Sequence, residues 1–203
     1  MIIAGYPGIG KSSLALERVD VIDLESSIFC HEDGHRDSDW YIQYCKVAEY
    51  LSKEGYIVFV SSHLAVVTQL LYNSKEVFCI IYPSLALKDR WILRLKNRYL
   101  MDQSEKNLRA VERAEEFYET DILNIIDLWS KRHPLFYRTH EIQSINYNLS
   151  DVVDKLKHDN RACVIEPPKD VVERWTDYLK PALSNPIPID STDEARDTDE
   201  TDS

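Results

Sequence analysis

Apolar runs and helix-like segments alternate along roughly the first 160 residues of the chain. Short runs rich in apolar residues predict strands at 1–4, 19–24, 56–60 and 77–82, and a weaker run predicts a fifth strand at 142–146. Apolar residues at helical spacing predict helices over 12–18, from 37 or 38 to 54, over 64–71, in two or more pieces over 85–131, and over about 149–158. Strands that alternate with helices favour an α/β fold with a parallel sheet and right-handed crossovers.

Composition divides the chain into a main domain and a C-terminal extension. Residues 1–158 are long enough to form one substantial core. Residues 159–189 hold five of the eight prolines and one helix-like piece, which predicts a small appendage. The last segment, 190–203, carries seven acidic residues and one arginine, and it is expected to be disordered.

More than half of the net charge of −11 lies in that last segment, so the main domain is only mildly acidic. An acidic surface repels a phosphate backbone, which argues against nucleic acid as a partner. The four cysteines, Cys30, Cys45, Cys79 and Cys163, are far apart and indicate reduced thiols of an intracellular protein. No apolar stretch has the length of a membrane span. We therefore expect a cytoplasmic protein without a membrane partner, either a monomer or a homodimer.

The turn after the first predicted strand has the composition of a phosphate-binding loop. The segment GYPGIGKS matches the pattern G-x-x-x-x-G-K-[ST] between a strand and a helix, and an ordinary glycine-rich turn is the alternative. Glycines let backbone N–H groups curl closely around a phosphate, while Lys11 reaches the β and γ phosphates and Ser12 is a ligand for Mg²⁺. The residues predicted to bind ATP here are Gly5, Pro7, Gly8, Ile9, Gly10, Lys11, Ser12 and Ser13.

Two carboxylates, Asp23 and Glu25, lie at the end of the second predicted strand. Ligands of open α/β sheets lie outside the carboxyl ends of the strands, and residues two apart on a strand point to the same side. We expect Asp23 to hold Mg²⁺ together with Ser12, and Glu25 to orient or deprotonate an acceptor. Solvated acids at a strand end are the alternative. The third strand ends in Ser-Ser-His without an aspartate, which argues against a motor-type or switch-type ATPase.

Three arginines, Arg90, Arg94 and Arg98, lie four residues apart in LKDRWILRLKNRY, and therefore along one stripe of a helix. A helical lid over about 88–131 that closes with these arginines stabilises the charge of a transferred phosphoryl group. We assign Arg94 and Arg98 to catalysis and Arg90 to nucleotide binding. A solvated basic face paired with acids of the next helix, such as Glu115, is the alternative.

Together these segments resemble the small P-loop kinases, the group of nucleoside monophosphate kinases and of shikimate and gluconate kinases. The resemblance spans roughly residues 1–157 and rests on the loop, on VIDLESS, on the arginine-rich helix after IIYPSLALK, and on HEIQSIN followed by YNLSDVVDKL. VIDLESS and VSSH also look like kinase-like proteins of phages and Gram-positive bacteria that are described as adenylate or nucleotide kinases. This group implies a three-layer P-loop NTPase fold, with a five-stranded parallel sheet of order 2-3-1-4-5, helices on both faces and a lid. It also implies that Asn146 lies near the adenine.

By the same resemblance, residues 26–44 and the end of the third strand face the acceptor. Arg36 is suited to an acceptor phosphate or carboxylate, and Trp40 and Tyr41 to stacking on a base, although core packing is the alternative for the aromatic residues. Ser62 and His63 complete the predicted acceptor site. Cys30, His31 and His35 also suggest a zinc site, for which Cys45 or Asp37 is needed as the fourth ligand.

The function that we expect is ATP-dependent and Mg²⁺-dependent transfer of a phosphoryl group to a small acceptor, first of all a nucleoside or deoxynucleoside monophosphate. A kinase of a hydroxylated metabolite or of a modified DNA base is the nearest alternative. A module that binds or slowly hydrolyses ATP without an acceptor is the alternative from another class.

Overall fold

The computed structural model describes residues 1–31, 37–74, 76–130 and 137–161, with the backbone alone for 128–130, 137 and 160–161. Within these residues, five parallel strands form one sheet in the order β2-β3-β1-β4-β5. The strands are β1 (Ile2–Gly5), β2 (Val21–Asp23), β3 (Ile57–Ser61), β4 (Phe78–Pro83) and β5 (Tyr137–Ile142). The α/β class and the predicted strand order are confirmed.

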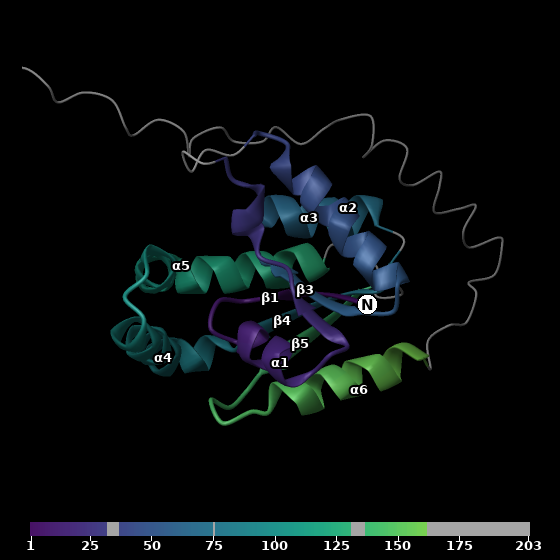
Figure 1. Cartoon of the computed structure of the whole chain (residues 1–203). Coiled ribbons are helices and arrows are strands. Elements are labelled where there is room, and N and C mark those ends of the chain that lie inside the picture. The colour runs from purple at the N-terminus through teal and green to yellow at the C-terminus, as the bar shows by residue number, and fades with distance from the viewer. Residues whose placement is uncertain (32–36, 75, 131–136, 162–203) are drawn as a thin grey trace, which may run out of the picture. The chain divides into compact units, whose positions relative to one another are not determined.

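Helices cover both faces of this sheet (Figure 1). The α-helices are α1 (Lys11–Glu17), α2 (Trp40–Lys53), α3 (Leu64–Asn73), α4 (Lys88–Met101), α5 (Glu105–Ser130) and α6 (Leu149–Arg161), and short 3-10 helices are η1 (Ser26–Phe29) and η2 (Leu85–Leu87). Helices α2, α3 and α5 lie on one side of the sheet, and α1 and α6 lie on the other. None of the described helices is long and apolar enough to cross a membrane.

The core is built around the three central strands, β1, β3 and β4, which are buried along almost their whole length. Because helices cover both of their faces, these strands consist of nearly continuous apolar runs. Trp91 of α4 and Tyr118 of α5 are fully enclosed in the same core. The two helices that occupy the predicted lid, 88–131, are therefore anchored in the core by large aromatic residues.

The position predicted for the fifth strand, 142–146, is wrong, because β5 ends at Ile142 and residues 145 and 146 form a turn. The reason lies in the place of β5 at the edge of the sheet, where it pairs only with β4. Between Tyr137 and Ile142 the residues of β5, RTHE, are all polar, so this edge strand lacks the continuous apolar run of the central strands.

Helix boundaries follow from local chemistry at several ends. Helix α2 stops at Gly55, whose φ of 94° allows the N–H groups of Gly55 and Tyr56 to reach back to the carbonyls of Ser52 and Leu51. At the start of α6, the Asn148 side chain accepts a hydrogen bond of 2.9 Å from the backbone of Ser150. Helix α6 runs to Arg161, past the expected domain boundary at 158. The rest of the predicted appendage and the acidic tail lie outside the described residues.

Candidate functional site

The glycine-rich loop, residues 5–12, joins β1 to α1 in a conformation that its glycines make possible. Gly8 and Gly10 have φ angles of 86° and 95°, in the left-handed region that side chains with a Cβ disfavour. A Cβ on Gly8 would also lie 2.8 Å from a methyl carbon of Leu95, and one on Gly5 would overlap the side chain of Ile9. The sequence pattern of the loop therefore reflects both backbone conformation and close packing.

Two aromatic side chains hold the outer part of this loop. The Trp91 indole donates to the carbonyl of Pro7 at 2.9 Å, and the Tyr147 hydroxyl donates to the carbonyl of Ile9 at 2.5 Å. Their rings are stacked, with centroids 6.1 Å apart and planes 13° apart. Helix α4 and the turn before α6 thus fix the loop from the side.

Ser12 and Asp23, the predicted metal ligands, are brought together across two elements. The Ser12 hydroxyl, in the first turn of α1, donates a hydrogen bond of 2.6 Å to the carboxylate at the end of β2. Hydroxyl and carboxylate oxygens are hard ligands of the kind that Mg²⁺ prefers. The pair can therefore hold a divalent cation where the loop passes into α1, next to the end of β2, a place called the mouth of the loop below.

The ammonium group of Lys11 lies inside the loop, where it donates to the carbonyl of Gly5 at 2.8 Å. Burial lowers the pKa of Lys11, the charges of Asp23 and Glu25 oppose this, and the cations Lys106 and Arg98 add to it. These four side chains act electrostatically on Lys11, so the mouth of the loop is a cluster of both signs of charge. The cations of this cluster favour a bound anion.

The carboxylate of Glu25 already has a partner in the structure. It forms an ion pair with Lys106 from the first turn of α5. Sequence reasoning missed Lys106, because a single lysine in EKN has no motif, and its distance of 81 residues from Glu25 gives no local signal.

The three arginines of α4 differ in their surroundings. Arg98 is half-buried, burial lowers its pKa, and its Nε has no hydrogen-bond partner among the described residues. Arg94 lies 5.5 Å from the ring centres of both Trp91 and Tyr147, and it donates a long hydrogen bond of 3.4 Å to the carbonyl of Ile145. Arg90 is exposed to solvent. Arg94 and Arg98 are thus near the glycine-rich loop or its aromatic supports.

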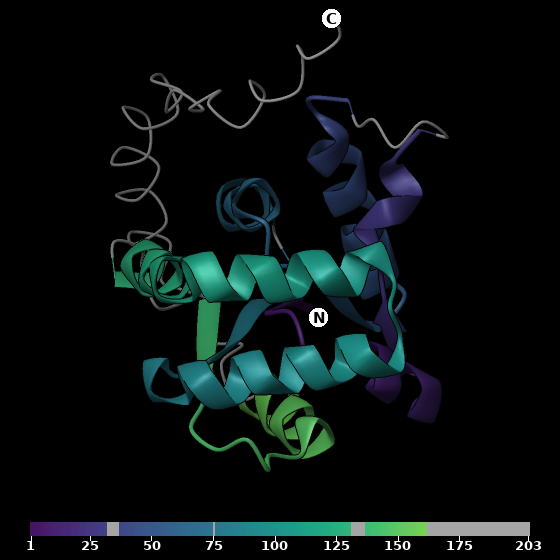
Figure 2. The same cartoon turned by 90° about the vertical axis from the view of Figure 1, so that its left-hand side faces the viewer.

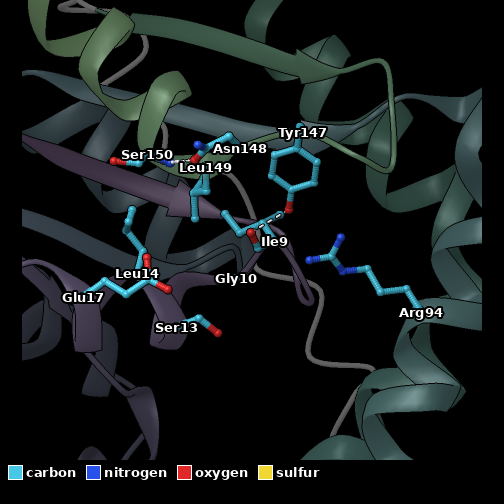
Figure 3. A pocket seen from close by; sticks show the side chains of 10 residues that line it. All are labelled: Ile9, Gly10, Ser13, Leu14, Glu17, Arg94, Tyr147, Asn148, Leu149 and Ser150. Carbon is cyan, nitrogen blue, oxygen red and sulfur yellow. Dashed lines mark hydrogen bonds between the residues drawn. The ribbon is translucent and has the colours of Figure 1, made fainter.

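A cavity of about 300 Å³ opens beside the loop, between α1, α4 and the turn before α6 (Figure 3). It is lined by Ile9, Gly10, Ser13, Leu14, Glu17, Arg94, Tyr147, Asn148, Leu149 and Ser150. Arg94 reaches into it from one side and the α1 residues lie opposite (Figure 3). Asn146, predicted to lie near a base, is exposed and is not part of this lining, whereas Asn148 is.

No protein-family model matches the chain, and no curated protein matches it. Among solved structures, an uncharacterized protein from Eubacterium ventriosum ATCC 27560 is similar, with 10% sequence identity and a TM-score of 0.40. The match covers 79% of this chain and 97% of that chain. The site therefore has to be interpreted from its own chemistry.

Three of the predicted acceptor residues, Trp40, Tyr41 and His63, form an aromatic group near the carboxyl end of β3. Trp40 packs edge-to-face against His63, with centroids 6.0 Å apart, and it also packs against Tyr41. The His63 ring is hydrogen bonded to the Ser61 hydroxyl at 2.6 Å, and Ser62 is half-exposed.

Two further predictions concern the segment that precedes α2. Arg36 lies outside the described residues, as does His35 of the suggested zinc site. In the part of the chain that the structure describes, no group of three or more histidine, cysteine, aspartate or glutamate residues is placed to hold a metal ion.

Proposed function

We propose that the chain is an ATP-dependent phosphotransferase of the P-loop kinase type, and that its glycine-rich loop binds the phosphates of the donor. The observation that carries this proposal is the 2.6 Å hydrogen bond from Ser12 to Asp23 at the mouth of the loop. It joins a loop hydroxyl to a strand-end carboxylate, the two oxygen ligands expected for a nucleotide-bound Mg²⁺.

The residues present fit a magnesium ion and a triphosphate. Both ligands of the metal are hard oxygen donors, and beside the left-handed Gly10 no atom lies closer than 3.9 Å to the position of a Cβ, so the backbone is accessible there. The chemistry that a bound Mg²⁺ supplies at such a place is neutralisation of phosphate charge. In the protein itself, Ser12 and Asp23 would hold this ion.

The cavity beside the loop supports a site for the base and sugar of the donor. Arg94 and Tyr147 offer a cation and an aromatic face, which suit the flat surface of a purine. Ser13 and Asn148 add polar atoms at the edge of the cavity. A ligand seated there extends toward the loop, because Ile9 and Gly10 line both places.

Transfer requires few groups beyond these, because phosphoryl transfer depends on positioning and charge stabilisation. An oxygen of the acceptor phosphate bonds to the γ-phosphorus, the bond from that phosphorus to the β–γ bridging oxygen breaks, and ADP leaves. Lys11 and Arg98 stabilise the charge of the transferred group. Glu25 positions the acceptor by accepting a hydrogen bond, and it takes the proton when the acceptor is an alcohol.

The acceptor that we propose is a nucleoside or deoxynucleoside monophosphate. Trp40, Tyr41 and His63 support this choice, because they gather aromatic surface near the end of β3. A hydroxylated metabolite as acceptor uses the same Glu25 as a base. Because the reaction consumes ATP, we expect it to take place in the cytoplasm.

A screen of acceptors by ADP production tests this proposal. The wild-type protein with ATP and Mg²⁺ is offered nucleoside monophosphates, sugars and polyol acids, and DNA, with Lys11→Ala as the matched control. Stimulation by a nucleoside monophosphate, lost in the variant, is the expected result. Stimulation only by another class of compound would identify that class as the acceptor in place of nucleoside monophosphates. ATP binding without any stimulated release of ADP would contradict phosphotransferase activity.

A further inference from the structure

A second lysine, Lys106, lies close to the end of β2 because it forms an ion pair with Glu25. It lies in the first turn of α5 and pairs with Glu25 across 81 residues of sequence, at the mouth of the glycine-rich loop. Glu25 lies two residues after Asp23, which accepts a hydrogen bond from Ser12 of the loop, so the ion pair brings Lys106 near this end of the loop. A lysine this close to the loop has a role open to it beyond the ion pair.

The turn between α4 and α5 fixes the position of Lys106. The buried Asn107 side chain donates to both the backbone carbonyl and the carboxylate of Asp102, each at 2.8 Å, and the Ser104 hydroxyl donates to the same carboxylate. The Asp102 N–H in turn bonds to the carbonyl of Arg98 at 3.0 Å. Helices α4 and α5 run side by side from this turn (Figure 2), which places Lys106 and Arg98 at the same end of the pair.

A second cation at this end of the helix pair has hydrogen-bonding capacity left. The Nε of Arg98 is buried and has no hydrogen-bond partner among the described residues. Charged donors of this kind suit a polyanion. Lys106 is 61% exposed, so its long side chain is free to change partners, whereas Glu25 is 38% exposed.

We propose that Lys106 is a further phosphate-contacting residue, which leaves Glu25 for the γ-phosphate when the donor binds and thereby frees Glu25 to position the acceptor. This inference rests on the proposed phosphotransferase activity and adds an order of events to it. Without the donor, Lys106 neutralises Glu25; with the donor, the same lysine contacts the group to be transferred. Donor binding therefore prepares the acceptor site.

The test compares MgATP with MgADP in calorimetric titrations of the wild type, Lys106→Ala and Lys96→Ala. Lys96 is the matched control, because it also pairs with a glutamate across helices, Glu115, with similar exposed fractions of 50% and 46%. A charged contact to the γ-phosphate is worth roughly 10- to 100-fold in affinity. Lys106→Ala should therefore weaken the binding of MgATP by about that factor and hardly change the binding of MgADP. Lys96→Ala should bind both nucleotides like the wild type.

Glu25→Gln should change the affinity for MgATP in the opposite direction to Lys106→Ala. Removing the carboxylate releases Lys106 and one negative charge, so MgATP affinity should rise by roughly 3- to 10-fold while acceptor-dependent turnover is lost. The rise should disappear in the double variant with Lys106→Ala, because the released lysine is then absent.

Three results separate the possibilities. If the wild type binds neither nucleotide, the proposed function itself fails. If it binds both and Lys106→Ala keeps the wild-type preference for MgATP over MgADP, only the role of Lys106 is overturned. If both single variants merely lower the unfolding temperature to a similar extent with unchanged affinities, the ion pair is structural and the partner exchange is wrong.

Discussion

At the scale of single residues, Gly8 of the glycine-rich loop is constrained both by its backbone conformation and by packing. Gly8 needs its left-handed backbone, and it also lies against Leu95 and Trp91, which pack onto the loop from α4. Gly55, at the end of α2, has a similar φ of 94° but no atom within 4 Å of a Cβ built there. A comparison of the two positions therefore separates the cost of backbone strain from the cost of packing.

Alanine substitutions at these glycines should differ in cost. Gly55→Ala should lower the free energy of unfolding by about 1 kcal/mol, the cost of the left-handed backbone alone. Gly8→Ala should cost about 2–4 kcal/mol, because overpacking against Leu95 adds to the same strain. Urea unfolding of both variants measures this. Equal losses would show that the loop yields to the added methyl group without strain.

At the scale of elements, Tyr44 of α2 links two strand ends that carry the candidate site. Its buried hydroxyl donates to the carbonyl of Leu24 at 2.7 Å and accepts from the N–H of Ser61 at 2.8 Å. Leu24 lies between Asp23, which ends β2, and Glu25, and Ser61 ends β3. A single hydroxyl thus fixes the spacing of these two segments.

Tyr44→Phe should therefore affect both stability and acceptor binding. Loss of both hydrogen bonds should cost about 1–3 kcal/mol, and the acceptor KM should rise, while the affinity for MgATP stays close to that of the wild type. Tyr118→Phe is the control, because it removes one buried hydrogen bond, to the carbonyl of Ser84 at 2.9 Å, which lies directly after β4 and not at the ends of β2 and β3. An acceptor KM raised equally in both variants would attribute the effect to general destabilisation.

The elements also show what the sequence could predict. The buried strands β1, β3 and β4 were predictable, because a strand covered on both faces must be apolar throughout. The edge strand β5 was misplaced, because the polar residues between its two ends give no such run. The glycine-rich loop was predictable from spacing, whereas the pairing of Glu25 with Lys106 depends on how α5 folds back over the sheet. Contacts of this kind between distant segments leave no local pattern.

At the scale of the whole molecule, one ionic network joins the element that follows the loop to the last described helix. Arg18, just after α1, pairs with Asp20 at 2.9 Å and with Asp154 of α6 at 2.8 Å, and it also donates to the Ser150 hydroxyl. Lys157 of α6 approaches the same Asp20 carboxylate at 3.3 Å. This network connects α1, β2 and α6 on one face of the sheet.

The network should make stability depend on pH. The hydrogen bond from Arg18, helped by Lys157, lowers the pKa of Asp20 to about 2. A lowered carboxylate pKa stabilises the fold above the unfolded value of about 3.9, and this contribution is lost as the pH falls through the folded value. Because the Asp20 side chain is 36% exposed, we expect Asp20→Asn to cost only about 1 kcal/mol at pH 7.

Urea unfolding of the wild type and Asp20→Asn between pH 7 and pH 2 measures this difference. It should shrink from about pH 5 downward and nearly vanish near pH 2. A difference that stays constant over this range would show that the carboxylate charge does not act through Arg18.

All of the proposed chemistry depends on the binding of a polyphosphate by the glycine-rich loop. Titration of the wild type and Lys11→Ala with MgATP, followed by calorimetry and by thermal unfolding, measures this binding. At a hundred times the dissociation constant, binding adds about 2.7 kcal/mol, which corresponds to a rise of roughly 5–10 °C in the unfolding temperature. We predict heat and this rise for the wild type and neither for Lys11→Ala. No heat and no rise with the wild type, or equal binding by the variant, would contradict phosphate binding by the loop.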